Sequence, residues 1–146
     1  MGDGLLQALE DIGLGTESRD YLHAHEFGHH VQFELGVFDD YVGSPETTRR
    51  TELMADGFGA YFCAHSRGAS FQANRFANVM SAAFAIGDCA FDDPGHHGTP
   101  NQREKAAQWG ANRAASARNQ GHVYSSAQLL VLFDEALPWL VAPDAP

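Results

Sequence analysis

The chain has 146 residues, a formal net charge of −10 at pH 7 and a single lysine, Lys105. This length favours one domain with a sizeable core, and the acidic balance argues against a nucleic-acid or anionic membrane surface, because phosphate groups are bound by clustered basic side chains. The longest apolar run, residues 129–133, is far shorter than the about 20 residues that span a bilayer, and no export signal is evident, so a soluble chain is expected.

The first 18 residues are expected to lie at the periphery of the domain. Residues 1–15 are rich in glycine and acidic residues, and their apolar patch of Leu5, Leu6 and Leu9 is long enough for a turn or two of helix. From about Arg19 to Leu35, apolar spacing of three and four residues predicts a helix. The residues predicted to share one face of it are Tyr21, Leu22, His25, His29 and Phe33.

This helix contains the motif His25-Glu26-Phe27-Gly28-His29, an H-E-x-x-H pattern. On a helix, His25 and His29 lie one turn apart on the same face, where two imidazoles can bind one zinc ion. Glu26 lies roughly 100° round the helix from His25, where it is poorly placed as a ligand but can take a proton from a water activated by the metal. The motif predicts a zinc site with Glu26 as general base. An ordinary amphipathic helix with packed or solvated histidines is the alternative.

A second helix is predicted from Ser44-Pro45, an N-cap followed by proline at the first helical position, to about residue 65. Glu52 and Asp56 are four residues apart in it and therefore share a face. Gly57 and Gly59 each weaken a helix interior by about 1 kcal/mol relative to alanine. A cation beside Glu52 and close backbone packing against the first helix would offset these costs. The alternative is a solvated acidic face.

Three further helices complete a mainly α fold of about five helices with little or no sheet. One is expected over residues 70–86 with an apolar face typical of the core, and a loop containing His96 and His97 follows it. The next begins at the N-cap Thr99 and runs to about residue 118. The last begins at Ser125 with a capping box and ends before Pro138. Residues 142–146 are expected to be loose.

The two cysteines, Cys63 and Cys89, are interpreted as thiols. They fall near the C-terminal ends of two consecutive predicted helices. An antiparallel packing of those helices would keep the two sulfur atoms about a helix length apart. A disulfide would require a different packing.

The two motif-bearing helices together predict a complete metal site. A catalytic zinc ion usually has three protein ligands, and two histidines with one glutamate is a recurring set. His25 and His29 supply two ligands, and Glu52 is the predicted third. Asp56, one turn on, is placed to accept a hydrogen bond from the second ring nitrogen of a ligand histidine. With Glu26 moving the water proton, the predicted reaction is hydrolysis of a peptide or amide bond.

Four segments, in this order, resemble the successive motifs of the bacterial neutral zinc metallopeptidase family, a gluzincin-like group. They are His25-Glu26-Phe27-Gly28-His29-His30-Val31-Gln32, Glu52-Leu53-Met54-Ala55-Asp56, Ala85-Ile86-Gly87-Asp88, and His97-Gly98-Thr99 with Gln102-Arg103. The resemblance covers about residues 21–110 and implies a single helical zincin-like catalytic domain over residues 1–146. The site that it implies has Zn²⁺ on His25, His29 and Glu52, with Glu26 catalytic, Asp56 beside the ligands and a peptide or protein as substrate.

The resemblance also draws attention to His97, which lies just before a predicted helix. The implied role is a hydrogen bond to the oxyanion or the substrate, and a structural loop histidine is the alternative. The other histidines are interpreted as ordinary surface or packing residues: His23, His30, His65, His96 and His122.

One part of the family pattern is not evident in the sequence. Members usually carry a membrane-anchoring segment and short strands ahead of the zinc helix, and in zincins an edge strand pairs with the extended substrate. A fragment of a longer bacterial protein and a shortened homologue would both explain the difference. Two further readings therefore stay open: a catalytically inactive peptidase-like binding or structural module, and a helical interaction domain without a metal.

Overall fold

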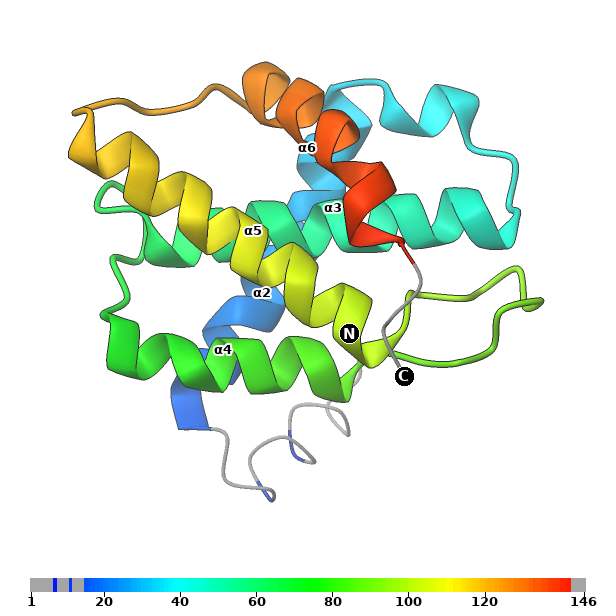
Figure 1. Ribbon diagram of the computed structural model, residues 1–146, viewed down its shortest axis with the longest axis horizontal. Helices are drawn as coiled ribbons and strands as arrows, with labels where there is room; N and C mark the ends of the chain where they lie inside the picture. Colours follow the sequence, from blue (N-terminus) through cyan, green and yellow to red (C-terminus); the bar gives the residue numbers. More distant parts are fainter. Residues whose placement is uncertain (1–6, 8–10, 12–14, 143–146) are drawn as a thin grey trace.

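The computed structural model describes residues 7, 11 and 15–142 (Figure 1). The predicted patch of Leu5, Leu6 and Leu9 and the tail beyond residue 142 lie outside the described residues. Within them the chain is helical and has no strand, so the prediction of a mainly α fold of about five helices is confirmed. The elements are α2 (Gly15–Glu34), the 3₁₀ helix η1 (Val37–Asp40), α3 (Pro45–Ala64), α4 (Ala73–Ala85), α5 (Pro100–Asn119) and α6 (Ser126–Leu140).

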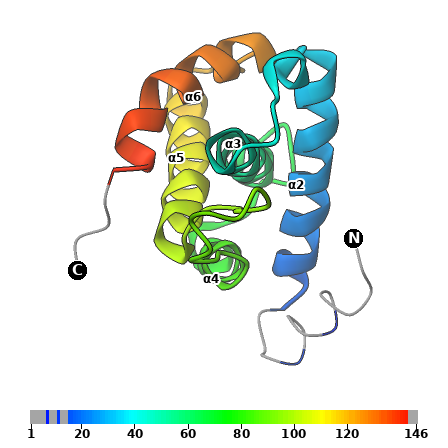
Figure 2. The ribbon, with the colours of Figure 1, turned by 90° about the vertical axis from the view of Figure 1, so that its right-hand side faces the viewer.

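Helix α3 lies at the centre of the fold. Viewed along its axis, it is surrounded by α2, α4, α5 and α6 (Figure 2). Its main partners are α5 and α2, while α4 packs against both of these and α6 covers α3 and α5. A residue on α3 can therefore contact side chains from several other helices at once.

Three of the helices begin at capping boxes, each at a residue that the sequence predicts as a helix start. In each box the side chain of the cap residue accepts a hydrogen bond from the backbone N–H three residues later. The side chain of that later residue in turn accepts a bond from the backbone N–H of the cap. The cap residues are Ser44, Thr99 and Ser125. Such a cap typically contributes about 1 kcal/mol. Proline at the first helical position, as in Pro45 and Pro100, fixes the backbone further.

Helix α2 begins four residues before the predicted start at Arg19. Glu17 accepts a bond from Arg75 of α4 at 2.7 Å, and Ser18 is buried, so these two residues pack against the rest of the fold. At the other end, the prediction that Phe33 shares the face of His25 is wrong, since Phe33 is exposed and Gln32 is buried. At 100° per residue, Gln32 lies about 20° from His25 and Phe33 about 80°.

The prediction that the last helix ends before Pro138 is also wrong, because α6 continues to Leu140. Proline in the final turn removes the backbone bond that its own nitrogen would donate and crowds the carbonyl group four residues earlier, so this turn needs another source of stability. Leu140 is fully buried in the core against the other helices, which holds that last turn in place.

The packing of α2 on α3 depends on glycines. A Cβ atom added at Gly59 would lie 2.9 Å from the backbone nitrogen of His25, and one at Gly28 would lie 3.1 Å from Cα of Ala55. The predicted close packing at Gly59 is therefore confirmed. Gly57 faces α5 instead, where its added Cβ would lie 3.0 Å from the Trp109 ring. The contacts between α2 and α3 place the turns that carry His25 and His29 beside the turns that carry Glu52 and Asp56.

The structure also describes the two cysteines and the length and polarity of each helix. Both cysteines are thiols, with Cys63 buried in α3 and Cys89 exposed in the loop after α4. Within the described part of the chain, no helix has both the length and the apolar character that crossing a bilayer requires.

Candidate metal centre

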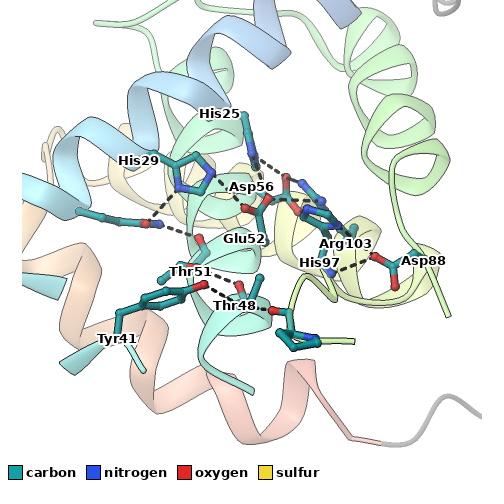
Figure 3. Close-up of polar contacts among 12 residues, drawn as sticks. His25, His29, Tyr41, Thr48, Thr51, Glu52, Asp56, Asp88, His97 and Arg103 are labelled. Carbon is teal, nitrogen blue, oxygen red and sulfur yellow. Dashed lines mark hydrogen bonds and ion pairs between the residues drawn. The ribbon is translucent and has the colours of Figure 1, made fainter. Parts of the chain in front are cut away.

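His25, His29 and Glu52 converge between α2 and α3, where Figure 3 shows the three side chains pointing toward one another. One ligand atom from each lies within 4.8 Å of the other two. Nε2 of His25 is 3.4 Å from Oε2 of Glu52, and Nε2 of His29 is 3.3 Å from Oε1. Ligand atoms on a tetrahedral zinc ion, with bonds of about 2.0–2.2 Å, are separated by about 3.4 Å. The two histidine–glutamate distances, each to a different carboxylate oxygen, are close to this value, and the donor set suits a small divalent cation.

The second ring nitrogen of His25 is held by Asp56. Nδ1 of His25 and Oδ1 of Asp56 are 2.9 Å apart, and the same oxygen accepts a 2.6 Å bond from the Tyr21 hydroxyl. Because a carboxylate only accepts, Nδ1 of His25 carries a proton toward Asp56, and Nε2 is the ring nitrogen directed toward Glu52 and His29. Nε2 can bind a metal ion once it has given up its own proton. A carboxylate behind a histidine in this way fixes the ring in a metal-binding orientation.

Gln32 holds the ring of His29 through Nδ1, as Asp56 holds the ring of His25, but with an amide oxygen instead of a carboxylate. Its Nδ1 lies 3.2 Å from Oε1 of Gln32, and Nε2 of Gln32 donates a 2.7 Å bond to the carbonyl oxygen of Thr51. The bond to Thr51 leaves the amide oxygen of Gln32 to accept from His29. Both imidazoles thus direct Nε2 toward the same point.

A buried arginine completes the cluster from a third helix. Arg103 of α5 donates to both oxygens of Asp56, through Nε at 2.6 Å and Nη2 at 2.8 Å, and its Nη1 lies 3.5 Å from Oε2 of Glu52. Asp56 is fully buried and Arg103 is 2% exposed. Removing either partner would break a buried bidentate ion pair, so the pair links the site to the stability of the fold.

The charges of the cluster shift the titration of its members. Burial alone lowers the pKa of His25, but hydrogen bonds to Asp56 and Glu52 outweigh it and raise that pKa to about 9. Burial acts to raise the pKa of Glu52, yet the two histidines hold it well below its ordinary value. Burial likewise acts to raise the pKa of Asp56, but Arg103 and His25 outweigh it and hold that pKa below its ordinary value. A divalent cation at the three ligands would take the place of the His25 proton.

Glu26 and His97 line the same cleft as the three ligands. This cleft has a volume of about 450 Å³, and its wall also includes Leu22, Ala85, Ile86 and Arg103. Glu26 is exposed on α2, next in sequence to His25. The structure therefore brings every residue singled out for metal binding or proton transfer to one place, with Asp56 directly behind it.

A larger hollow of about 640 Å³ lies on the other flank of α2. Its wall is apolar, with side chains such as Phe27, Phe62 and Leu129, and Asp20 is the only carboxylate among its lining residues. None of the three clustered ligands borders it. Metal-assisted hydrolysis requires metal-binding and proton-transfer groups in one place, so the smaller cleft is the candidate active site.

Several residues that shape the site carried no role in the sequence interpretation. Tyr21 and Gln32 lie four residues before His25 and three after His29, the spacing at which helical side chains meet, so the pattern contains a signal for both. Arg103 and Asp88 belong to the segments that carry the family resemblance. Their contacts depend on how α5 and the loop before it fold against α3.

No protein-family model, no curated protein and no solved structure matches the chain.

Proposed function

We propose that the protein is a zinc-dependent metallopeptidase that hydrolyses peptide bonds. The observation that carries the proposal is the convergence of His25, His29 and Glu52 in a cleft that also exposes Glu26. A set of two imidazoles and one carboxylate suits zinc, and a catalytic zinc site keeps a fourth position open for water. The resemblance of the four sequence segments to the neutral zinc metallopeptidases supports the same activity.

In this proposal, each residue around the ligands has a defined task. Zinc bound at the three ligands would lower the pKa of a water molecule to about 7 and polarise a carbonyl group. Glu26 would take the proton of that water on its carboxylate and return it to the leaving amine. Asp56 and Gln32 keep the two ligand rings oriented through their Nδ1 atoms. His97 would face the substrate from the opposite wall of the cleft.

The test is the change Glu26→Gln, which keeps the size of the side chain and removes its basicity. We expect the variant to bind zinc like the parent chain and to lose peptide hydrolysis by at least about 100-fold. Glu34→Gln is a matched control, because Glu34 lies on the exposed side of the same helix and its one ion pair with the described residues is to His30 at 4.0 Å. Hydrolysis of an unstructured protein such as casein, measured with all three proteins, decides the point. Turnover by Glu26→Gln at the parental rate would contradict the mechanism.

A catalytically inactive peptidase-like binding or structural module is the second candidate. The observation that favours it is that no strand lies beside α2 among the described residues, so they offer no edge strand for an extended peptide. This candidate predicts that zinc binds and stabilises the fold, while neither the parent chain nor Glu26→Gln cleaves any peptide. The helical domain without a metal predicts that zinc does not bind at all.

A further inference from the structure

We propose that Asp88 is a positioning residue that fixes the orientation and the tautomer of His97, so that Nε2 of His97 faces the metal cleft. Asp88 follows α4 and accepts four hydrogen bonds from its own loop. Oδ2 accepts from the backbone N–H of His97 at 2.9 Å and from its Nδ1 at 3.1 Å. Oδ1 accepts from the backbone N–H of Ala90 at 2.9 Å and from Nδ1 of His96 at 2.5 Å.

The tautomer follows from the chemistry of the carboxylate. Burial acts to raise the pKa of Asp88, but the backbone N–H of His97 and then the His96 ring outweigh it and hold that pKa well below its ordinary value. Asp88 is therefore ionised at neutral pH and accepts only. Both histidines must then carry a proton on Nδ1. In the neutral ring of His97, Nε2 is left as a bare acceptor, and it donates only when the ring is an imidazolium.

The two histidines share one carboxylate but differ in what they can reach. The His96 side chain is 1% exposed and packs near the Phe91 ring, and its buried Nε2 has no hydrogen-bond partner among the residues that the structure describes. The His97 side chain is 50% exposed and lines the cleft. In Figure 3, Asp88 lies on the side of His97 away from Glu52 and the two histidines of α2. His96 thus acts as an inner support for the carboxylate, and His97 is the ring presented to a bound molecule.

The loop that holds this pair is tied down on both sides. The backbone N–H of Asp88 donates a 2.8 Å bond to the carbonyl oxygen of Gly98, which closes the loop at its base. Near its far end, the hydroxyl of Thr48 on α3 donates a 2.6 Å bond to the carbonyl oxygen of Pro94. Asp88 therefore holds His97 from a fixed frame, and this orientation does not require a substrate.

The consequence for catalysis rests on the proposed function. A ring whose Nδ1 is bonded to a carboxylate can offer only Nε2 to the substrate. In the neutral ring this nitrogen accepts a hydrogen bond from the substrate, and in the imidazolium it donates one to a developing oxyanion. In either state it must be held in place before the reaction. Replacing a partner that orients a reacting or ligating histidine typically costs 10- to 100-fold in activity. Asp88 has no contact with His25, His29 or Glu52, so its loss should leave the metal in place.

The primary test reads the tautomer of His97 directly by ¹⁵N NMR of the histidine rings in the full chain. The spectra are recorded at about pH 8.5, roughly two units above the ordinary histidine pKa. We expect His97 of the parent chain to carry its proton on Nδ1, and Asp88→Asn to shift it toward the Nε2 form. Asp93→Asn is the matched control: it removes a charge from the same loop, but Asp93 bonds only to the Gly95 N–H through its side chain. We expect that variant to keep the parental tautomer.

Activity gives the second readout. Asp88→Asn should retain its zinc content and lose about 10- to 100-fold in kcat, with Asp93→Asn near the parental rate. A parent chain in which His97 is protonated on Nε2 would overturn the proposal, and so would a tautomer that Asp88→Asn leaves unchanged. Neither result depends on measurable peptide hydrolysis by the parent chain or by the variant. A parent chain without hydrolysis contradicts the proposed function, while the ring spectra still decide the role of Asp88.

Discussion

Asp56 of α3 lies directly behind His25 of α2, with Oδ1 of the carboxylate 2.9 Å from Nδ1 of the ring. The same carboxylate is paired through both oxygens with the buried guanidinium of Arg103. Metal-ligand orientation and the charge balance of the interior therefore depend on one side chain. This coupling gives the first of four predictions.

Replacing Asp56 with asparagine should weaken zinc binding and the fold together. The variant loses the carboxylate that orients His25, which we expect to cost 10- to 100-fold in zinc affinity. It also removes the bidentate partner of Arg103, which is 2% exposed and keeps only the longer 3.5 Å contact with Glu52. Breaking this buried pair should cost about 3–5 kcal/mol in the free energy of unfolding. Competition with a zinc chelator and urea denaturation measure the two effects.

Asp134→Asn is the control for this change. Asp134 forms a bidentate pair with Arg50 on the surface between α3 and α6, at 2.9 Å for each bond. An exposed pair of this kind contributes at most about 1 kcal/mol, and Asp134 forms no hydrogen bond or ion pair with His25, His29 or Glu52. Equal losses of stability from Asp56→Asn and Asp134→Asn would contradict the account of the buried pair.

Replacing Gln32 with leucine should weaken zinc binding without changing a ligand. The variant frees Nδ1 of His29 and leaves the carbonyl oxygen of Thr51 without its side-chain donor. We expect about a tenfold loss of zinc affinity and a loss of about 1–3 kcal/mol of stability for the unsatisfied buried group. Gln108→Leu on the exposed face of α5 is the control, since Gln108 bonds only to Asn112. Parental zinc affinity in Gln32→Leu would show that His29 needs no orienting partner.

Zinc binding should release a proton and strengthen with pH. In the folded protein the pKa of His25 is about 9, above its ordinary value of 6.5. The stabilisation from protonated His25 is therefore fully present below about pH 6.5 and is lost as the pH rises through about 9. Zinc needs the neutral ring, so from His25 alone its apparent affinity should rise about tenfold per pH unit up to about pH 9. Calorimetry in buffers of different ionisation enthalpy counts the released protons, and an affinity that stays flat between pH 7 and pH 9 would contradict this linkage.

Much of the fold follows from local signals in the sequence. The caps at Ser44, Thr99 and Ser125 act within four residues, so the starts of α3, α5 and α6 could be predicted. The errors occur where tertiary packing decides. Pro138 stays inside α6 because the buried Leu140 holds the last turn, and Gly57 packs on Trp109 of α5 rather than on α2.

The candidate site shows the same division. His25, Glu26 and His29 are arranged by the period of one helix, and Glu52 with Asp56 by the period of another, so the two halves are visible in the sequence. The contacts of Arg103 with Asp56 join residues 47 apart, and those of Asp88 depend on a loop conformation. The spacing of these residues in the sequence does not predict the distance between their side chains, which only the folded structure shows.

The most direct test of the central claim is the zinc content of the purified protein, measured by elemental analysis beside His29→Ala and His30→Ala. His30 is the neighbouring histidine and points away from the cluster, with a 58% exposed side chain. The account predicts about one zinc ion per chain in the parent and in His30→Ala, and its loss in His29→Ala. A parent chain that binds no zinc even when zinc is supplied, or a His29→Ala variant that keeps it, would contradict the account.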